Sequence, residues 1–597
     1  MDWHHQLLDS AIWLGKAFII SWLAVACLAA LLGKFTDWGR QFLRVTWAWF
    51  SPARSLWPLA ILSLLILMTL FSVRMEILFT FWNNGIYTAM QDFNAATFWS
   101  LLAVFCILAA IHVARALVNF YISQAFQIHW RVWLTETLMS RWLDKQAYYR
   151  SQHLPSRTDN PDQRIQQDVA SFISTSLALF LGLISAVVSL FSFTLILWAL
   201  SGTLTVFGVE IPRAMTFLVY VYVLIATVFA VKLGRPLIKL NFLNEKLNAD
   251  FRYALIRLRE YGENIAFFRG EAVEHRTLLK RFSSVIGNTW AIVFRSLKFQ
   301  GFNLGVDQLA VVFPMVVQAP RFFSKQITLG DLMQTAQAFG QVQDSLSFFR
   351  TSYDEFASYR AVVNRLTGFL DTVDAADQLT MPQITHQGQD FAVESLNVNS
   401  PTGVTLTANL DLTLAPGAAL LVRGPSGVGK TTLLRAIAGL WPYASGNIIY
   451  PAGQQSLFLP QKPYLPLGTL RSALYYPLAE PAQADDDAVR AILEQIQLGH
   501  LATQLDVENE WTNILSLGEQ QRLAMGRVLL HRPQLVFLDE ASSAMDEGLE
   551  HAMYSLLRKE LPQVMLVSVG HRSSLAAFHS SELNLQGGGA WRLDASA

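Results

Sequence analysis

The chain has 597 residues, of which 52% are hydrophobic and only 15% are charged, whereas average chains carry about 25% charged residues. This balance excludes a purely soluble protein and favours a membrane protein with a soluble part. The formal net charge is zero and there are two cysteines, so nothing points to nucleic acid as a partner, and a disulfide framework or CxxC metal site is excluded.

The first apolar run covers residues 11–33 and is interrupted only by Lys16. It is long enough to span a membrane. We favour an uncleaved additional helix over a helix lying along the membrane surface, because no basic segment of the kind that opens a signal peptide precedes the run. Basic residues follow it, at Lys34, Arg40, Arg44 and Arg54, and place that end on the cytoplasmic side.

Six further apolar runs predict the core of the membrane part. They cover residues 57–80, 98–119, 172–200, 215–232, 302–322 and 327–349. The segments 131–168 and 232–298 are rich in Lys and Arg, so they are internal, and the soluble part is delivered to the cytoplasm. Both segments lack strong turn signals and predict helices that continue beyond the membrane, with breaks at Pro161 and Gly262 where short cross-helices form.

The last apolar run carries a polar stripe. Its members recur at three- and four-residue spacing and therefore share one helix face; they are Asp331, Gln334, Gln337, Gln341 and Asp344. We interpret the stripe as the lining of a translocation path, because polar groups in lipid usually face an interior cavity. The alternative is hydrogen bonding between helices without contact to a cargo. For Arg74 and Glu76 we favour a structural pair.

The predicted domain organisation follows the change in composition. Residues 1–56 hold the N-terminal helix and a connector, 57–370 the membrane domain, 371–390 a linker, and 391–597 a soluble α/β domain.

The clearest motif is GPSGVGKTT, which fits the phosphate-binding loop pattern G-x-x-x-x-G-K-[ST]. An apolar strand precedes it and a helix follows, so its backbone N–H groups form a concavity at the positive end of a helix. Lys430 is expected to reach the β- and γ-phosphates, and the Thr431 hydroxyl to bind Mg²⁺. The expected nucleotide-binding residues are Gly424, Pro425, Ser426, Gly427, Val428, Gly429, Lys430, Thr431 and Thr432.

Four further features follow in order. Gln461 is expected to contact Mg²⁺ and the attacking water, and LSLGEQQR (residues 515–522) opens a helix suited to binding phosphate. Asp539 ends an apolar strand and is a second Mg²⁺ ligand, while Glu540 polarises water for attack on the γ-phosphate. His571 follows another apolar strand and hydrogen-bonds the γ-phosphate.

Together these residues resemble those of an ABC transporter. Residues 424–432 match the Walker A motif, Gln461 the Q-loop, 515–520 the signature sequence, Asp539 with Glu540 the Walker B motif, 543–546 the D-loop and His571 the switch histidine. The resemblance implies an exporter-type α-helical membrane domain with six core helices, followed by an α/β P-loop ATPase domain. It also implies a homodimer in which ATP lies between the Walker A loop of one copy and Ser516, Gly518 and Glu519 of the other.

The membrane half resembles a narrower group. DNPDQRIQQD (159–168), RLREYGENIAFFRGEAVE (257–274) and APRFFSKQITLGDLMQTAQAF (319–339) are similar to bacterial SbmA/BacA-like permeases, including the YddA-like fused group, and to the fatty-acyl half-transporters of subfamily D. The resemblance places residues 159–168 and 260–271 at coupling helices that contact the nucleotide domain. It also implies the bacterial inner membrane as the location.

The expected function is therefore ATP-driven transport of a hydrophilic solute, such as a peptide or a cobalamin-like molecule. The alternatives are transport of fatty acids or acyl-CoA, and a non-transporting, nucleotide-gated membrane ATPase. One departure from the family pattern concerns the base: residues 397–406 contain no aromatic side chain to stack on adenine.

Overall fold

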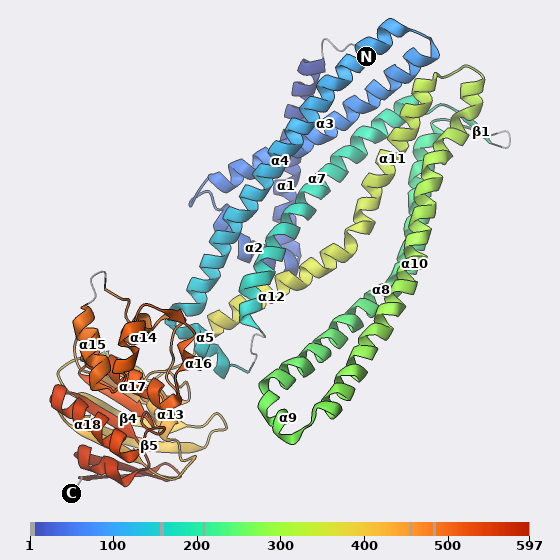
Figure 1. The fold of residues 1–597 in the computed structure, drawn as a ribbon. Coiled ribbons are helices and arrows are strands. Elements are labelled where there is room, and N and C mark those ends of the chain that lie inside the picture. The colour runs from blue at the N-terminus through green and yellow to red at the C-terminus, as the bar shows by residue number, and fades with distance from the viewer. Residues whose placement is uncertain (1–5, 156–159, 207–208, 454–455, 482–484, 596–597) are drawn as a thin grey trace. The chain divides into compact units, whose positions relative to one another are not determined.

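The computed structural model describes residues 6–155, 160–206, 209–453, 456–481 and 485–595. The chain forms two compact units, and each is described here by itself. Unit 1 consists of Met1–Ser140 and Asp159–Leu370, and unit 2 of Arg141–Thr158 and Asp371–Ala597. Figure 1 shows the first as a set of long helices and the second as sheets covered by shorter helices.

Unit 1 is almost entirely helical. Its helices are α1 (Gln6–Phe35), α2 (Asp37–Phe50), α3 (Trp57–Gln91), α4 (Ala95–Leu143), α6 (Pro161–Gln163), α7 (Val169–Leu200), α8 (Ala214–Glu260), α9 (Gly262–Phe268), α10 (Glu271–Phe323), α11 (Leu329–Thr351) and α12 (Tyr353–Asp377), of which α4 and α12 end in unit 2. A π-helical turn, η3 (Arg164–Asp168), leads into α7, and a short hairpin of β1 (Leu204–Val206) and β2 (Val209–Ile211) precedes α8.

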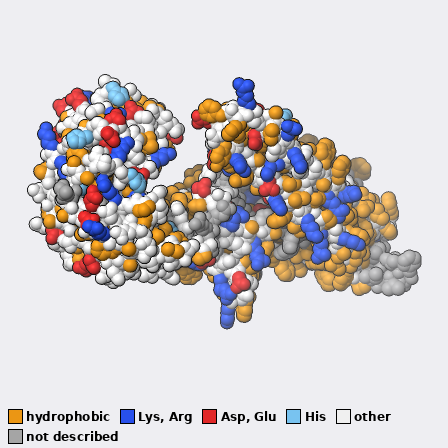
Figure 2. Space-filling model, turned by 90° about the horizontal axis from the view of Figure 1, so that it is seen from below, with side chains coloured by type: hydrophobic (Ala, Val, Ile, Leu, Met, Phe, Trp, Pro, Cys, Tyr) orange, Lys and Arg blue, Asp and Glu red, His pale blue; other side chains and the backbone are white. Residues whose placement is uncertain are grey.

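Within the described residues, six helices are long and apolar enough to cross a membrane: α1, α3, α4, α7, α8 and α10. Hydrophobic side chains accordingly gather over the surface of unit 1, while the surface of unit 2 is mixed (Figure 2). The predicted architecture, an α-helical membrane region followed by an α/β domain, is confirmed. The sixth predicted core run forms α11, whose polar stripe keeps it outside this apolar group, yet it packs against α3, α7, α8 and α10.

The polar stripe of α11 divides into two parts. At its first turns, Asn84 of α3 donates hydrogen bonds to Asp331 (2.9 Å) and Gln334 (2.7 Å). The two helices approach closely there, because a Cβ added at Gly330 would lie 2.1 Å from the carbonyl oxygen of Asn84. This end of the stripe joins helices, as the alternative interpretation proposed, whereas Gln337 and Asp344 line a cavity described below.

The additional N-terminal helix is attached to the core through Arg74. Its Nε donates to Ser10 Oγ at 3.0 Å and its Nη2 to Gln6 Oε1 at 3.2 Å. The expected pairing of Arg74 with Glu76 is therefore wrong, because the guanidinium is directed toward polar groups of α1.

The two predicted breaks differ. Gly262 begins the short helix α9, which separates the long helices α8 and α10. Pro161 instead begins a continuous path into α7, where buried Asp168 accepts hydrogen bonds from Arg365 (2.6 and 2.8 Å) and Arg164 (3.1 Å). Of the predicted coupling segment 159–168, Asp159 lies outside the described residues, and its contact with the nucleotide domain stays a prediction.

A segment outside the predicted coupling regions belongs to unit 2. The short helices α5 (Ala147–Arg150) and η2 (Ser151–His153) follow α4. The Tyr443 hydroxyl donates to the backbone oxygen of His153 at 3.2 Å, and the His153 ring meets Trp441 edge-on at 5.1 Å. The sequence did not single out this segment, because its contact partners lie about 290 residues further along the chain.

Unit 2 is built on two sheets. A six-stranded sheet has the order β14-β13-β6-β12-β11-β8, and a four-stranded sheet has the order β3-β7-β4-β5. Their strands are β3 (Gln383–His386), β4 (Phe391–Asn399), β5 (Thr405–Leu414), β6 (Ala419–Arg423), β7 (Ala444–Tyr450), β8 (Ser456–Leu459), β11 (Leu535–Asp539), β12 (Met565–Val569), β13 (Ser581–Gly587) and β14 (Ala590–Ala595). The short strands β9 (Gly468–Thr469) and β10 (Glu508–Asn509) pair separately.

Helices cover the larger sheet. They are α13 (Lys430–Ile437), α14 (Leu470–Tyr475), α15 (Asp486–Gln495), α16 (Trp511–Ile514), α17 (Leu517–His531) and α18 (Glu547–Glu560), with 3-10 turns η4 (Gly499–Gln504) and η5 (Ser573–Phe578). Strands β6 and β11 are buried almost throughout, which is typical of parallel strands covered on both faces.

A neutral histidine is buried beside this sheet. His579 Nδ1 lies 2.7 Å from the Leu575 carbonyl oxygen and Nε2 lies 2.8 Å from Ser568 Oγ. A carbonyl oxygen only accepts, so Nδ1 carries the proton and Nε2 accepts from the serine. Burial lowers the pKa of His579 to about 4, from the ordinary value of about 6.5.

Because His579 is neutral when buried, we expect the stability of unit 2 to fall in acid. Because the folded pKa is lower than the unfolded one, stability is full above pH 6.5 and is lost as the pH falls toward 4. The free energy of unfolding of unit 2 is expected to fall by about 2 kcal/mol between pH 7 and pH 5. Pulse proteolysis in urea, with detection of a C-terminal tag, measures it. His579→Gln is expected to flatten this dependence and the exposed control His500→Gln to preserve it; an unchanged slope in His579→Gln would contradict the assignment.

Candidate functional site

The predicted catalytic residues meet at one edge of the larger sheet. Strands β6, β12, β11 and β8 are neighbours in that order, and each adjacent pair is parallel. The carboxyl ends of parallel strands lie at the same edge. The phosphate loop follows β6, His571 follows β12, Asp539 and Glu540 lie at the end of β11, and Gln461 follows β8.

The phosphate loop depends on glycine at two positions where the backbone is left-handed. Gly424 has a φ of +148°, and a Cβ there would lie 2.5 Å from the carbonyl oxygen of Leu585. Gly429 has a φ of +109°, and its Cβ would press on Leu406. These conformations curl residues 424–429 so that α13 begins directly after the loop, with Pro425, Ser426 and Gly427 exposed to solvent.

Lys430 is directed back across the loop. Its Nζ donates to the carbonyl oxygens of Gly424 (2.9 Å) and Pro425 (3.0 Å), and the side chain is buried. The ammonium thus lies over the concavity in which the loop's N–H groups would hold phosphate. Both hydrogen bonds of the ammonium are therefore accepted by backbone carbonyl oxygens of the loop itself.

The expected magnesium ligands are neighbours. Thr431 Oγ1 donates to Asp539 Oδ1 at 3.1 Å. Burial raises the pKa of Asp539, although the hydrogen bond from Thr431 opposes the shift. A hydroxyl and a carboxylate beside a phosphate site fit Mg²⁺, which is usually held by one or two carboxylates plus substrate phosphates. In keeping with so sparse a site, no cluster of three or more His, Cys, Asp and Glu side chains that could hold a metal occurs among the described residues.

Glu540 is held between the two other predicted catalytic side chains. Gln461 Nε2 donates to Glu540 Oε2 at 3.1 Å, and His571 Nε2 lies 3.3 Å from Glu540 Oε1. Glu540 itself has a φ of +52°, a strained value for a residue with a side chain. The carboxylate, which follows β11, is therefore positioned by groups that follow two other strands, β8 and β12. Gln461, expected near Mg²⁺ as well, contacts Glu540 here.

One positioning residue was not expected from the sequence. Gln521, in α17, is completely buried. Its Nε2 donates to the backbone oxygen of Gln461 (2.8 Å) and to Ser543 Oγ (3.2 Å), and its Oε1 accepts from the backbone N–H of Ala544 (3.0 Å). Gln521 therefore joins the Gln461 loop to residues 543–544. The signal in the sequence was weak, because a glutamine inside an amphipathic helix resembles an ordinary surface residue.

The signature residues lie at the start of α17. Ser516 caps the helix, its hydroxyl donating to Glu519 Oε2 at 2.8 Å while that carboxylate also accepts from the Ser516 backbone N–H at 2.9 Å. This hydrogen bond from Ser516 lowers the pKa of Glu519. Gly518 lies against residue 544, since a Cβ there would be 3.0 Å from the Ala544 carbonyl oxygen. Within the described part of the chain, Ser516 and Glu519 hydrogen-bond with each other and not with the phosphate loop of the same copy.

The region expected to contact adenine is aliphatic. A turn joins β4 to β5, with Ser400 donating its N–H to the Val404 carbonyl oxygen at 2.8 Å. Val404 is 59% exposed, and Leu406 lies next to Gly429. The side chains of Val404 and Leu406 at this turn are aliphatic, and residues 397–406 contain no aromatic ring.

Comparison with known proteins identifies the neighbours of this chain. The family model described as ABC transporter transmembrane region 2 matches residues 45–323, and the model described as ABC transporter matches residues 407–543. An ABC transporter ATP-binding protein of Haemophilus influenzae is 50% identical over 593 residues, which cover 99% of this chain and 100% of that protein.

Two further relatives belong to the narrower groups that the membrane half resembles, the YddA-like proteins and subfamily D. The inner membrane ABC transporter ATP-binding protein YddA of Escherichia coli is 32% identical, with 85% of this chain and 91% of that protein covered. ABC transporter D family member 2, chloroplastic, of Arabidopsis thaliana is 32% identical, with 92% and 86% covered. The predicted resemblance to ABC transporters, including YddA-like and subfamily D proteins, is confirmed.

A solved structure shares the fold. A bacterial Atm1-family ABC exporter with ATP bound superposes with a TM-score of 0.70 at 18% identity, over 90% of this chain and 95% of that chain. The exporter-type fold expected for the membrane part is confirmed by this likeness.

Gln521 supplies a test of how the site is positioned. Gln521→Leu keeps the volume but removes both hydrogen bonds to the Gln461 loop and residue 544, so the geometry around Glu540 relaxes. We expect kcat for ATP hydrolysis to fall about tenfold, or about 1.4 kcal/mol, with KM for ATP little changed. Steady-state ATPase assays measure both, and exposed Gln495→Leu is the matched control. Loss of ATP binding together with kcat would indicate general misfolding instead.

Proposed function

Because the chain belongs to the ABC transporter family, we propose that it is a half-transporter in which two copies clamp ATP and move a hydrophilic solute across the bacterial inner membrane. The chain is an ATP-driven membrane transporter, and its ATPase domain couples hydrolysis to transport. The dimer, the cargo and the membrane in which it works are the proposal. YddA, the Escherichia coli relative, is named as an inner membrane protein, which supports the last point.

The observation that carries the ATPase mechanism is the position of Glu540 between Gln461 and His571. In our proposal Glu540 accepts a proton from the attacking water, and His571 contacts the γ-phosphate. The loop 424–432 and Lys430 bind the phosphates, with Thr432 completing the loop. Mg²⁺, when bound at Thr431 and Asp539, neutralises phosphate charge.

The second copy completes each site in this proposal. Ser516, Gly518 and Glu519 lie at a helix start where Ser516 is exposed and the other two residues are half-buried. A helix N-terminus favours an anionic ligand. Leu517 (39% exposed) and Ile514 (53% exposed) lie beside it, which supports a surface that becomes covered in a dimer. ATP bound between two copies would then draw the nucleotide units together and, through Gln461, change cavity access.

The cargo proposal rests on a cavity of about 450 Å³ within unit 1, whose lining combines polar side chains with apolar ones such as Met315 and Met333. Its polar lining comes from α3, α10 and α11, and consists of Asn83, Tyr87, Asp307, Gln337, Gln343 and Asp344. Asn83 donates to Gln337 at 2.9 Å, and Gln343 donates to Asp307 at 3.1 Å. Polar side chains among apolar helices are costly and usually functional. Two carboxylates favour a cargo with positive charge and hydrogen-bonding groups, such as a peptide.

The relatives of subfamily D support a second candidate, transport of fatty acyl groups or acyl-CoA. Acyl-CoA carries several phosphate charges, and the carboxylates of Asp307 and Asp344 would repel them. The cavity chemistry therefore favours the hydrophilic cargo.

Glu540→Gln tests the catalytic proposal. The amide cannot accept the proton of water, so we expect ATP hydrolysis to fall at least about 100-fold, while ATP binding persists and the dimer stays closed. Hydrolysis of radiolabelled ATP and retention of the nucleotide on gel filtration measure the two effects. Unchanged turnover would remove Glu540 from the proposed role.

A transport assay tests the cargo proposal separately. In proteoliposomes we expect ATP-dependent movement of a labelled cationic peptide, and none of a labelled acyl-CoA. The double substitution Asp307→Asn with Asp344→Asn is expected to lower peptide transport roughly tenfold, and exposed Asp92→Asn to leave it unchanged. Preferential movement of acyl-CoA would establish the second candidate, and flux independent of hydrolysis would indicate a gated channel.

A further inference from the structure

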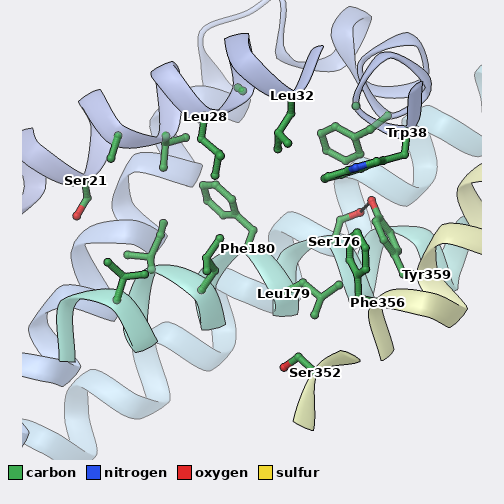
Figure 3. A pocket seen from close by; sticks show the side chains of 18 of the residues that line it. Ser21, Leu28, Leu32, Trp38, Ser176, Leu179, Phe180, Ser352, Phe356 and Tyr359 are labelled. Atoms are coloured by element: carbon green, nitrogen blue, oxygen red, sulfur yellow. Dashed lines mark hydrogen bonds between the residues drawn. The ribbon is translucent and has the colours of Figure 1, made fainter. Parts of the chain in front are cut away.

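A second cavity in unit 1 lies between the additional N-terminal helix and the core. Its volume is about 720 Å³. One wall is a single face of α1, another is α7, and the remainder comes from α2 and the α11–α12 region (Figure 3). The α1 residues recur at helical spacing: Ser21, Ala24, Val25, Leu28, Ala29 and Leu32. In Figure 3, Leu28 and Leu32 face Phe180 and Leu179 across the space.

The lining is mostly apolar, and two of its hydroxyl groups, those of Ser176 and Tyr359, are hydrogen-bonded within the protein. Ser176 Oγ donates to the backbone oxygen of Phe172 at 2.5 Å, so Tyr359 Oη, which lies 2.7 Å from Ser176 Oγ, donates its proton to the serine. Neither hydroxyl therefore has a proton left to offer a ligand. A cavity lined in this way disfavours water and favours a hydrocarbon occupant.

One end of the cavity is closed by aromatic rings. Trp38 of α2 meets Phe356 of α12 edge-on at 5.3 Å, and Phe42 lies 5.8 Å from Phe172. These contacts fix α2 across the ends of α7 and α12. The cavity is thus bounded by α2 at one end and is continuous with the apolar surface of α1, where Leu28 is 42% exposed.

The opposite face of α2 is basic. Arg40, Arg44 and Trp47 recur at four- and three-residue spacing and are exposed, and Lys34 ends α1 immediately before. Residues 34–44 contain three basic side chains and one acidic side chain, Asp37, which forms an ion pair with Arg40, so this segment has a formal net charge of +2. An amphipathic helix with Arg and Trp on its outer face is typical of a helix in the interface of an anionic membrane.

This cavity is distinct from the proposed cargo cavity. The two share no lining residue, and the cargo cavity is bounded by α3, α10 and α11 without α1 or α2. An occupant of the apolar cavity would therefore not lie in the proposed translocation path.

We propose that the apolar cavity binds one acyl chain of an anionic membrane phospholipid, whose headgroup lies at the basic α1–α2 turn. Its volume falls within the range of about 300–1,000 Å³ typical of small-molecule sites, and its walls include helices long and apolar enough to cross the membrane. The bound chain packs α1 against α7 and the start of α12. In this role the additional helix forms a lipid site that the core helices alone would leave open.

Photocrosslinking tests the proposal. The purified full chain is reconstituted in phosphatidylcholine vesicles that contain a small fraction of phosphatidylglycerol with a diazirine near the end of one acyl chain. After irradiation, we expect label on peptides containing residues 21–32 and 179–188. Ala24→Trp fills the cavity and is expected to lower this labelling at least about fivefold, whereas Ala26→Trp, on another face of α1, retains it. Leu183→Trp fills the cavity from α7 and serves if Ala24→Trp misfolds; retained ATPase activity reports folding.

Each alternative outcome has a definite meaning. Equal labelling in Ala24→Trp and Ala26→Trp, or label restricted to residues outside the cavity, would overturn the proposal. A diazirine-labelled free fatty acid that labels these peptides when the phospholipid does not would replace the phospholipid as the occupant. Equal labelling by a diazirine-labelled phosphatidylcholine would overturn the requirement for an anionic headgroup.

Discussion

The parallel order of β6, β12, β11 and β8 is the constraint on which the rest of the site depends. Four segments that are as much as about 145 residues apart in the chain reach one edge only because their strands run in the same direction. This edge joins the phosphate loop to Asp539 through Thr431, and it places Glu540 between Gln461 and His571. The strained backbone at Glu540 directly follows the buried strand β11, which is paired with a strand on each side.

Hydrogen bonds behind this edge connect it to helix α17. Gln521 holds the loop of Gln461 and the backbone at residue 544 at once, and Gly518 lies against the same carbonyl group of Ala544. We therefore expect a movement of Gln461 or of residue 544 to displace the start of α17. In our proposal this helix start contacts the nucleotide of the second copy.

The sequence predicted which residues meet at this edge, because glycines, Lys430 and the acidic pair after a strand have few other uses in this order. The chemical role of each residue stays a prediction. It predicted less of what depends on contacts between distant segments. The polar stripe at residues 331–344 is visible as a helical face, but only the structure separates the part bound by Asn84 from the part that lines a cavity. Likewise, only the structure shows that Arg74 binds α1 and that the side chain of Gln521 is buried. The apolar cavity beside α1 results from the packing of four segments, which periodicity cannot reveal.

The central claim is that nucleotide is bound between two copies of this chain, and site-directed disulfide formation tests it most directly. Only Cys27 and Cys106 need replacement before cysteines are introduced at Ser426 in the phosphate loop and Ser516 at the start of α17. We predict that mild oxidation gives a covalent dimer in the presence of ATP and Mg²⁺ when Glu540→Gln prevents hydrolysis, and little without nucleotide. A covalent dimer that forms equally with and without ATP, or a chain that stays monomeric under both conditions, would contradict the account.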